Sequence, residues 1–216
     1  MRRTVSGRSD SCARVGCLSF NGNKLITTGG GGMVVTDDDA IARRVRYLTT
    51  QAKDDPLEYV HGELGYNYRL TNLQAALGCS QLEQLDDHVA AKRRIAAEYA
   101  SRLSDVPGLT LMPEAAWAES AWWLYTVLVD EAEFGMSSRE LLRYLQQRKI
   151  QSRPLWQPMH RSPVHQSPDN PACPTADRLQ AQGLSLPCSV DATTAQLDRV
   201  IETIREAACR SEARAA

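Results

Sequence analysis

A lysine placed between a β-prone run and four consecutive glycines most constrains what this 216-residue chain can form. Residues 15–20 and 33–36 are short β-prone runs, and Asn21-Gly22-Asn23 separates the first run from Lys24. Because Asn and Gly tolerate positive φ, this pattern predicts two strands with a tight turn between them. The glycines at 29–32 would let a bulky group pack against bare backbone close to the lysine.

Lys24 is the candidate for covalent chemistry. Burial disfavours the charged form of a lysine and makes its amine a nucleophile that can form a Schiff base. Ser19 lies five residues earlier and could offer a hydroxyl to a phosphate. From the residues alone, Lys24 is either such a catalytic lysine or a surface lysine in a turn, and Ser19 could simply end a strand.

The glycine run also allows another hypothesis, a phosphate-cradling loop of a nucleotide-binding protein. That loop requires the pattern G-x-x-x-x-G-K-[S/T], in which the lysine follows the glycines. Here Lys24 precedes them. No acidic residue stands at Rossmann spacing after a G-x-G-x-x-G motif either, so the sequence disfavours this hypothesis.

The order of elements predicts a compact α+β unit, the small domain, over about residues 106–210. Acidic residues at 37–39 and arginines at 43, 44 and 46 predict a helix that complements its own dipole. Thr71 and Gln74 form a capping box that opens a helical region, in which apolar residues recur and the basic triplet 92–94 is expected to face solvent.

The small domain is expected to contain three strands and two helices. A second capping box, Ser137 with Glu140, opens one of these helices. A loop with six prolines covers residues 154–174. The strands are predicted at 109–112, 122–129 and 149–153, and the last helix at 197–208.

Charge and cysteine content exclude several classes of protein. The net charge of −1 gives no reason to expect binding to nucleic acid or to an anionic membrane. The six cysteines show neither the spacing of a zinc site nor that of a disulfide framework, so free thiols and no metal are expected. No apolar run has the length of a membrane span, and the start of the chain is not a recognisable signal peptide. The cytoplasm is the expected compartment.

Six separate segments resemble the sugar aminotransferases of the DegT/StrS type, which depend on pyridoxal phosphate and have fold type I. The resemblance covers residues 14–205. The sequences of the segments are most similar to the branch that acts on nucleotide-linked 4-keto-6-deoxy sugars of the bacillosamine or legionaminate kind. The segments occur in this order: CLSFNGNKLITTGGGGM (17–33), LTTQAKDDP (48–56), HGELGYNYRLTNLQAALG (61–78), QLEQLDD (81–87), SRPLWQPMH (152–160) and LSLPCS (184–189).

The resemblance implies roles for six residues. Lys24 would bind the cofactor's aldehyde and later act as general base and acid. Ser19 would hydrogen-bond the cofactor phosphate, and Asn67 would reach the phosphate of the neighbouring subunit in a homodimer. The residues expected to border the pocket for the nucleotide sugar are Arg69, Trp156 and His160. The expected reaction transfers an amino group from an amino-acid donor, glutamate, to the keto carbon of the sugar.

The residues themselves leave these roles open. Asn67 could be a turn residue and Arg69 could belong to a structural ion pair. Trp156, between prolines, could be a packing anchor, and His160 could lie at the surface.

The main departure from the family is length, because such enzymes are about twice as long and place the lysine near the middle. The resemblance implies a partial α/β fold, with a partial large domain over residues 1–70, a helical connector over 71–105 and a small α+β domain over 106–216. This partial fold would lack the aromatic residue and the aspartate that contact the cofactor ring. We therefore expect the chain alone to be inactive or nearly so. The alternative function is a non-catalytic remnant that serves as a dimerisation or binding module. A sister reaction, 3-dehydration of a sugar, is disfavoured because such relatives carry His where Lys24 stands.

Overall fold

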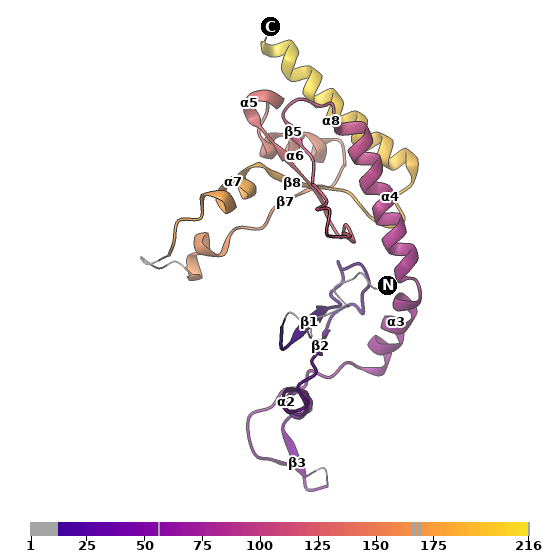
Figure 1. Cartoon of the computed structure of the whole chain (residues 1–216), viewed down its shortest axis with the longest axis vertical. Coiled ribbons are helices and arrows are strands. Elements are labelled where there is room, and N and C mark those ends of the chain that lie inside the picture. The colour runs from indigo at the N-terminus through magenta and orange to yellow at the C-terminus, as the bar shows by residue number, and fades with distance from the viewer. Residues whose placement is uncertain (1–12, 56, 166, 168–169, 216) are drawn as a thin grey trace. The chain divides into compact units, whose positions relative to one another are not determined.

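A computed structural model of the protein describes residues 13–55, 57–165, 167 and 170–215, without the side chains of 210–215 (Figure 1). The chain divides into two compact units, one running up to His88 with Ala116–Glu119 added, the other formed by Val89–Ala115 and the residues from Ser120 on. The boundaries expected near residues 70 and 105 stay predictions. The first unit contains β1 (Gly16–Ser19), β2 (Gly32–Val35), α2 (Asp39–Thr49), β3 (Lys53–Asp55), β4 (Val60–His61) and α3 (Asn72–Glu83). Helix α4 (Leu85–Leu103) begins in the first unit and continues into the second. The second unit then contains β5 (Leu109–Thr110), β6 (Tyr125–Val129), α5 (Glu131–Phe134), α6 (Ser138–Gln147), β7 (Arg153–Pro154), η2 (Met159–Arg161), η3 (Pro163–His165), α7 (Pro174–Gln182), β8 (Gly183–Leu186) and α8 (Thr194–Ala215).

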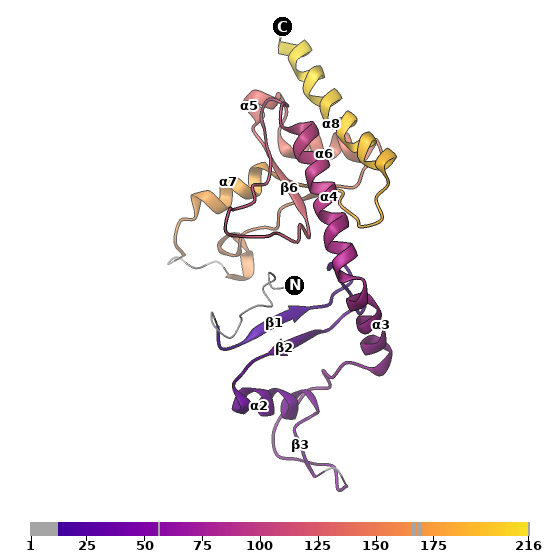
Figure 2. The same ribbon diagram turned by 45° about the vertical axis from the view of Figure 1, so that its right-hand side comes forward.

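The two strands predicted around Lys24 form an antiparallel hairpin (Figure 2). Ser19, the last residue of β1, pairs with Gly32, the first residue of β2. The predicted turn is confirmed, since the Lys24 backbone N–H donates to the Asn21 carbonyl at 3.0 Å. Positive φ angles occur further along the hairpin, at Gly29 (78°) and Gly31 (85°).

Side-chain caps begin the helices that the sequence predicts. Asp38 accepts hydrogen bonds from the Ala40 and Ile41 backbone N–H groups at the start of α2. The capping boxes at Thr71 and Ser137 are both formed and open α3 and α6. Each satisfies N–H groups that a helix start leaves without an intrahelical partner.

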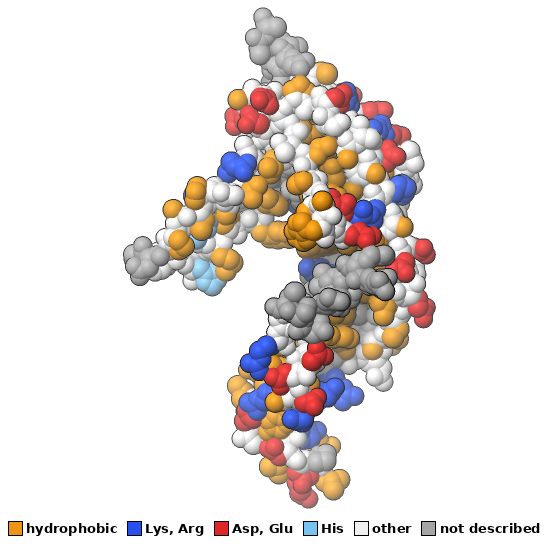
Figure 3. Space-filling view, viewed as in Figure 1, with side chains coloured by type: hydrophobic (Ala, Val, Ile, Leu, Met, Phe, Trp, Pro, Cys, Tyr) orange, Lys and Arg blue, Asp and Glu red, His pale blue; other side chains and the backbone are white. Residues whose placement is uncertain are grey.

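The described part of the first unit has almost no core of its own. Ala52 is its only buried apolar residue there, and Thr28 its only buried polar one. Apolar side chains instead reach the surface (Figure 3). They include Leu18, Met33, Val34, Leu57, Tyr59, Val60, Leu64, Tyr66, Tyr68, Leu73, Leu77 and Leu82.

The second unit has a substantial core around an antiparallel sheet of order β5-β6-β8-β7. Its largest fully buried side chains include Tyr99 of α4, Tyr125 of β6 and Phe134 of α5. The Tyr99 and Tyr125 rings stack with centroids 5.0 Å apart. Ion pairs of Arg102 with Asp198 and of Arg205 with Asp105 connect the α4 region to α8.

Three predictions about this unit were wrong in detail. The strand predicted at 149–153 is confined to Arg153–Pro154, because Lys149 leaves the end of α6 with a φ of 57°. The proline-rich segment contains two 3₁₀ turns, and α7 begins at Pro174, where the missing N–H costs nothing. The strand β8 had not been predicted.

Lys92 corrects the expectation that the whole basic triplet faces solvent. It is 7% exposed, and its Nζ donates to the Trp123 carbonyl at 3.0 Å and to the Cys188 carbonyl. Arg93 behaves differently, because it pairs with Glu114 at 2.8 Å. Lys92 thus connects α4 to the segments that precede β6 and follow β8.

Within the described ranges, no helix is both long enough and apolar enough to cross a bilayer. Cys17, Cys79, Cys173, Cys188 and Cys209 are free thiols, as the sequence predicted for them, while Cys12 lies outside the described residues.

Candidate active-site residues and family

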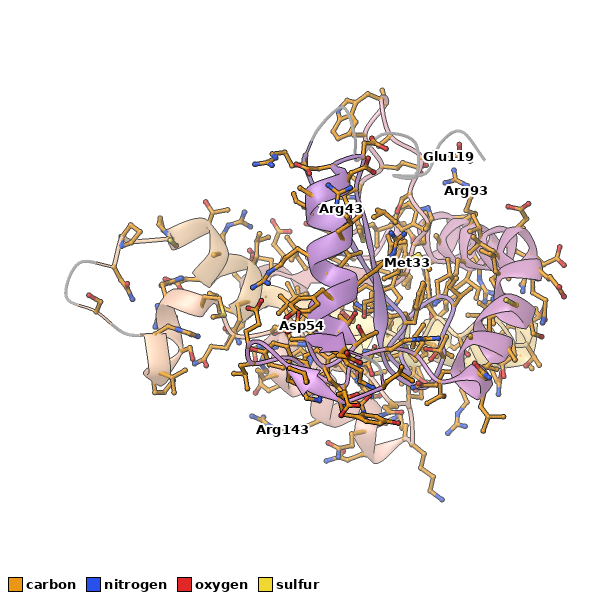
Figure 4. The ribbon with its side chains drawn as sticks, turned by 90° about the horizontal axis from the view of Figure 1, so that it is seen from below. Met33, Arg43, Asp54, Arg93, Glu119 and Arg143 are labelled. Carbon is orange, nitrogen blue, oxygen red and sulfur yellow. The ribbon has the colours of Figure 1, made fainter. Side chains whose placement is uncertain are left out.

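Lys24 lies in a loop that backbone hydrogen bonds close at both ends. The Phe20 N–H donates to the Gly31 carbonyl, and the Thr28 N–H donates to the Phe20 carbonyl, both at 3.0 Å. The Lys24 side chain is half-buried. The hairpin therefore holds the backbone of this lysine in one place. Met33, labelled in Figure 4, lies in β2, the second strand of the hairpin.

The hydroxyl groups of this hairpin divide into two kinds. Thr27 Oγ1 donates to the Phe20 carbonyl at 3.1 Å, and Thr28 Oγ1 donates to the Gly30 carbonyl, so both stabilise the loop itself. Ser19 is exposed at the end of β1. Among the described residues, none forms a hydrogen bond with its hydroxyl, which leaves Ser19 as the hairpin hydroxyl available to a ligand.

The glycine run brings other backbone and side-chain atoms very close. A Cβ built on Gly32 would lie 2.4 Å from the Leu18 carbonyl oxygen, and one on Gly31 would lie 2.6 Å from Leu70 Cδ2. A larger residue at Gly32 would displace the hairpin backbone, whereas one at Gly31 would push the Leu70 side chain aside and be strained by a φ of 85°. Gly29 and Gly30, in contrast, have nothing within 4 Å of such a Cβ and form the open side of the loop.

Asn67 and Arg69 are exposed on a segment that runs beside the end of α2. The Tyr66 N–H donates to the Leu48 carbonyl at 2.7 Å, and the Tyr68 N–H donates to the Thr49 carbonyl at 3.2 Å. Asn67 itself forms a backbone bridge with Thr50. The backbone of this segment is thus fixed, while its polar side chains remain accessible.

The turn that supports this segment is strained. Gln51 and Ala52 have φ angles of 73° and 49°, which side chains larger than glycine rarely adopt. A Cβ on Gly65 would lie 2.2 Å from the Gln51 carbonyl carbon, so the two strands of the loop approach closely. Nearby, Asp54 (labelled in Figure 4) accepts from the Tyr47 hydroxyl at 3.0 Å. Strain of this kind persists where the surrounding structure enforces it, often at functional loops.

Trp156 and His160 belong to the second unit, on the segment between β7 and α7. Trp156 is 66% exposed, and its ring stacks on Trp123 with centroids 6.0 Å apart. His160 Nε2 lies 3.0 Å from Asp177 Oδ1, and Arg161 Nε donates to the same oxygen at 2.8 Å. Arg161 and, to a smaller extent, His160 hold the pKa of the Asp177 carboxyl below its ordinary value.

The structure thus groups the predicted residues within each unit. Ser19 and Lys24 share one hairpin, Asn67 and Arg69 share one segment, and both lie in the first unit. Leu70 connects these two segments through its close approach to Gly31.

Sequence reasoning missed two partners, Trp123 and Asp177. Asp177 follows His160 by 17 positions, and no local pattern joins them. Trp123 stands in the predicted strand 122–129, but nothing in the sequence connects it to Trp156.

The donor set of the first unit fits pyridoxal phosphate. Lys24 could offer an amine for its aldehyde and Ser19 a hydroxyl for its phosphate, and the open glycines leave room for a bulky group. The amide of Asn67 is expected to serve the cofactor phosphate of the neighbouring subunit. Among the described residues, no group of three or more metal-ligating side chains occurs.

Comparison with known proteins agrees with this chemistry. Residues 4–205 of the chain match the DegT/DnrJ/EryC1/StrS aminotransferase family. A protein of Bacillus subtilis (strain 168) named as a pyridoxal phosphate-dependent aminotransferase, EpsN, is 38% identical over 205 residues, which are 91% of this chain and 51% of EpsN. The GDP-perosamine synthase of Caulobacter vibrioides is 37% identical over 206 residues, 94% of this chain and 54% of that protein.

Solved structures agree as well. The crystal structure of the aminotransferase TlmJ from Streptoalloteichus hindustanus superposes with a TM-score of 0.84 at 26% identity, over 91% of this chain and 52% of TlmJ. The predicted fold class, a partial α/β fold of the pyridoxal phosphate-dependent transferases, is confirmed by these matches. The chain spans about half the length of the relatives it matches. Pyridoxal phosphate is the cofactor they indicate, and the chain belongs to the DegT/DnrJ/EryC1/StrS aminotransferase family.

Proposed function

We propose that this chain supplies the lysine-bearing part of an aminotransferase that acts on nucleotide-linked sugars. The amino group would pass from an amino-acid donor, glutamate, to the keto carbon of a 4-keto-6-deoxy sugar. The observation that carries the proposal is the fixed hairpin around Lys24, in a chain of this family. The relative named GDP-perosamine synthase supports a nucleotide-linked sugar as substrate.

The chemistry divides between the cofactor and the chain. Pyridoxal phosphate, when bound, supplies an aldehyde and a ring that stabilises negative charge. Lys24 Nζ would hold the cofactor through its amine and would accept and return a proton as general base and acid. The closed hairpin fixes the backbone position from which this amine extends, which favours a repeated proton transfer at one atom.

The remaining residues bind and orient. Ser19 and Asn67 would donate hydrogen bonds to the phosphate, with Asn67 doing so across the interface of a homodimer. Arg69 would meet an anionic group of the substrate, and Trp156 and His160 would border its sugar. Trp156 suits this role because it is exposed yet held flat by Trp123. We place the enzyme in the cytoplasm, where its thiols would remain reduced.

The scarce core of the described first unit favours a second candidate, a non-catalytic module for dimerisation or binding. The chain spans 51% and 54% of two relatives, and the described first unit has scarcely any core. We therefore expect the chain alone to show little or no transamination. Appreciable turnover by the purified chain would contradict this expectation.

A titration of the purified chain with pyridoxal phosphate separates the two candidates. The enzyme proposal predicts a saturable absorbance band that Lys24→Ala removes. Lys149→Ala is the matched control, because Lys149 is an exposed lysine of the second unit and its loss should leave the band unchanged. Borohydride reduction followed by peptide mapping should place the cofactor on Lys24 among the four lysines of the chain.

The result decides between the candidates. A band that requires Lys24 supports the enzyme proposal. A folded chain that binds no cofactor, or that labels all accessible lysines equally, supports the non-catalytic module.

A further inference from the structure

A three-residue network surrounds His160 in the second unit. His160 lies in η2, Asp177 lies in the first turn of α7, and Asp177 Oδ1 meets both His160 Nε2 and Arg161 Nε. The side chains of His160 and Asp177 are largely buried, at 18% and 29% exposure. The network therefore has a defined geometry and differs from a loose surface ion pair.

Backbone contacts at the start of α7 hold Asp177 in position, independently of the contacts of its side chain. Pro174 begins α7 with the φ angle that a first helical turn needs, and the Asp177 N–H donates to the Cys173 carbonyl at 3.0 Å. On the other side, the Arg161 N–H donates to the Pro158 carbonyl at 2.9 Å and closes the 3₁₀ turn around His160. Two locally stable elements thus hold the carboxylate and the imidazole in contact.

The charge of Asp177 determines which nitrogen of the ring carries the proton. The hydrogen bond from Arg161 is the largest cause that lowers the pKa of Asp177, so the carboxyl is ionised at neutral pH. An ionised carboxylate accepts hydrogen bonds but cannot donate one. Nε2 must therefore be the donor, and in a neutral ring Nδ1 is then an acceptor.

Two residues of the network, Arg161 and Asp177, also line a groove, and His160 is not among the residues that line it. The groove has a volume of about 470 Å³, and its other lining residues are Gln157, Pro158, Arg178, Gln180 and Ala181. This volume lies in the range of small-molecule sites, about 300–1,000 Å³.

We propose that Asp177 is a positioning residue that holds His160 with Nε2 protonated, so that Nδ1 accepts a hydrogen bond from a hydroxyl of the nucleotide-linked sugar. The choice of a sugar hydroxyl rests on the proposed function. The orientation of the ring rests only on the contacts above. Histidines that must present one particular nitrogen are commonly oriented in this way by a carboxylate.

Nitrogen-15 NMR of the imidazole rings tests the orientation directly. Spectra would be recorded at about pH 8.5, two units above the ordinary imidazole pKa. His160→Gln identifies the signal among the four histidines of the chain. The wild type should show a neutral ring whose Nε2 proton is protected from exchange with solvent, and Asp177→Ala should lose that protection.

Two further variants separate orientation from structural damage. Arg161→Gln leaves the His160–Asp177 hydrogen bond in place and should keep the protected proton. Asp177→Glu keeps a carboxylate and should restore it at least in part. Circular dichroism would establish that each variant is folded. A wild type with Nε2 unprotonated, or a protected proton that survives Asp177→Ala, would overturn the proposal.

The ligand part is tested with GDP-mannose as the nucleotide-sugar probe. Binding would be followed independently by broadening of the ligand signals, and bound probe should shift the Nδ1 signal of the wild type. Bound probe that leaves Nδ1 unmoved would refute the hydroxyl contact. Failure of the aminotransferase proposal itself would appear elsewhere, in the cofactor titration of Lys24, so the two failures can be told apart.

Discussion

For two stacked tyrosines of the second unit, replacement by phenylalanine should change the stability of the chain in opposite directions. Tyr99 and Tyr125 are 0% and 1% exposed. The Tyr99 hydroxyl donates to the Pro187 carbonyl at 2.6 Å, whereas no described residue offers a partner to the buried Tyr125 hydroxyl. Tyr99→Phe therefore removes a hydrogen bond, and Tyr125→Phe removes a polar atom whose burial is uncompensated.

The magnitudes follow from these contacts. Either variant keeps the aromatic ring and its stacking, so the hydroxyl is the only group lost. Tyr99→Phe should lower the free energy of unfolding by about 0.5–1.5 kcal/mol, because the half-buried Pro187 carbonyl can regain water. Tyr125→Phe should leave it unchanged or raise it by up to about 1 kcal/mol.

Urea denaturation followed by far-ultraviolet circular dichroism is the assay. The slope with denaturant should be the same in both variants, so that the midpoints report stability alone. If Tyr125→Phe destabilised the chain as much as Tyr99→Phe, the assignment of hydrogen-bonded and unpartnered hydroxyls would be refuted.

Three further predictions use the same fold. Burial raises the pKa of Tyr99 above its ordinary value of 10.0, so above about pH 10 the folded state keeps a proton that the unfolded state loses. The free energy of unfolding should therefore fall as the pH rises above about 10, and it should fall less steeply in Tyr99→Phe. Melting curves at several pH values would measure this difference. Gly108→Ala should lower the free energy of unfolding by more than about 1 kcal/mol, since Gly108 has a φ of 70° and a Cβ there would lie 2.3 Å from the Phe134 nitrogen. Gly22→Ala is the control, because a Cβ on Gly22 would meet nothing within 4 Å, and it should change the urea midpoint little. Ser137→Ala should lower the free energy of unfolding by about 1 kcal/mol, because it removes the capping box of α6. An unchanged urea midpoint would contradict the capping role of Ser137.

Local patterns predicted what depends on neighbours in sequence. The hairpin around Lys24 and the capping boxes at Thr71 and Ser137 are confirmed, because turns and helix starts are specified within a few residues. The roles of the six site residues stay predictions.

Long-range contacts could not be predicted in the same way. Lys92 was expected at the surface because its neighbours are arginines, yet it is buried against carbonyls 31 and 96 positions away. The Asp177 contact with His160 depends on where α7 begins, and α7 was missed because no element was predicted for residues 175–182 after the proline-rich loop. Strand β8 was missed in a short run that only its pairing with β6 and β7 stabilises.

The uneven distribution of buried apolar side chains has a calorimetric consequence. The heat-capacity change of unfolding scales with the apolar surface that becomes hydrated, and the described first unit contributes little of it. A heating scan of the purified chain should therefore show one transition with the enthalpy of the second unit alone. The enthalpy per residue, averaged over the whole chain, should fall well below the value typical of globular proteins.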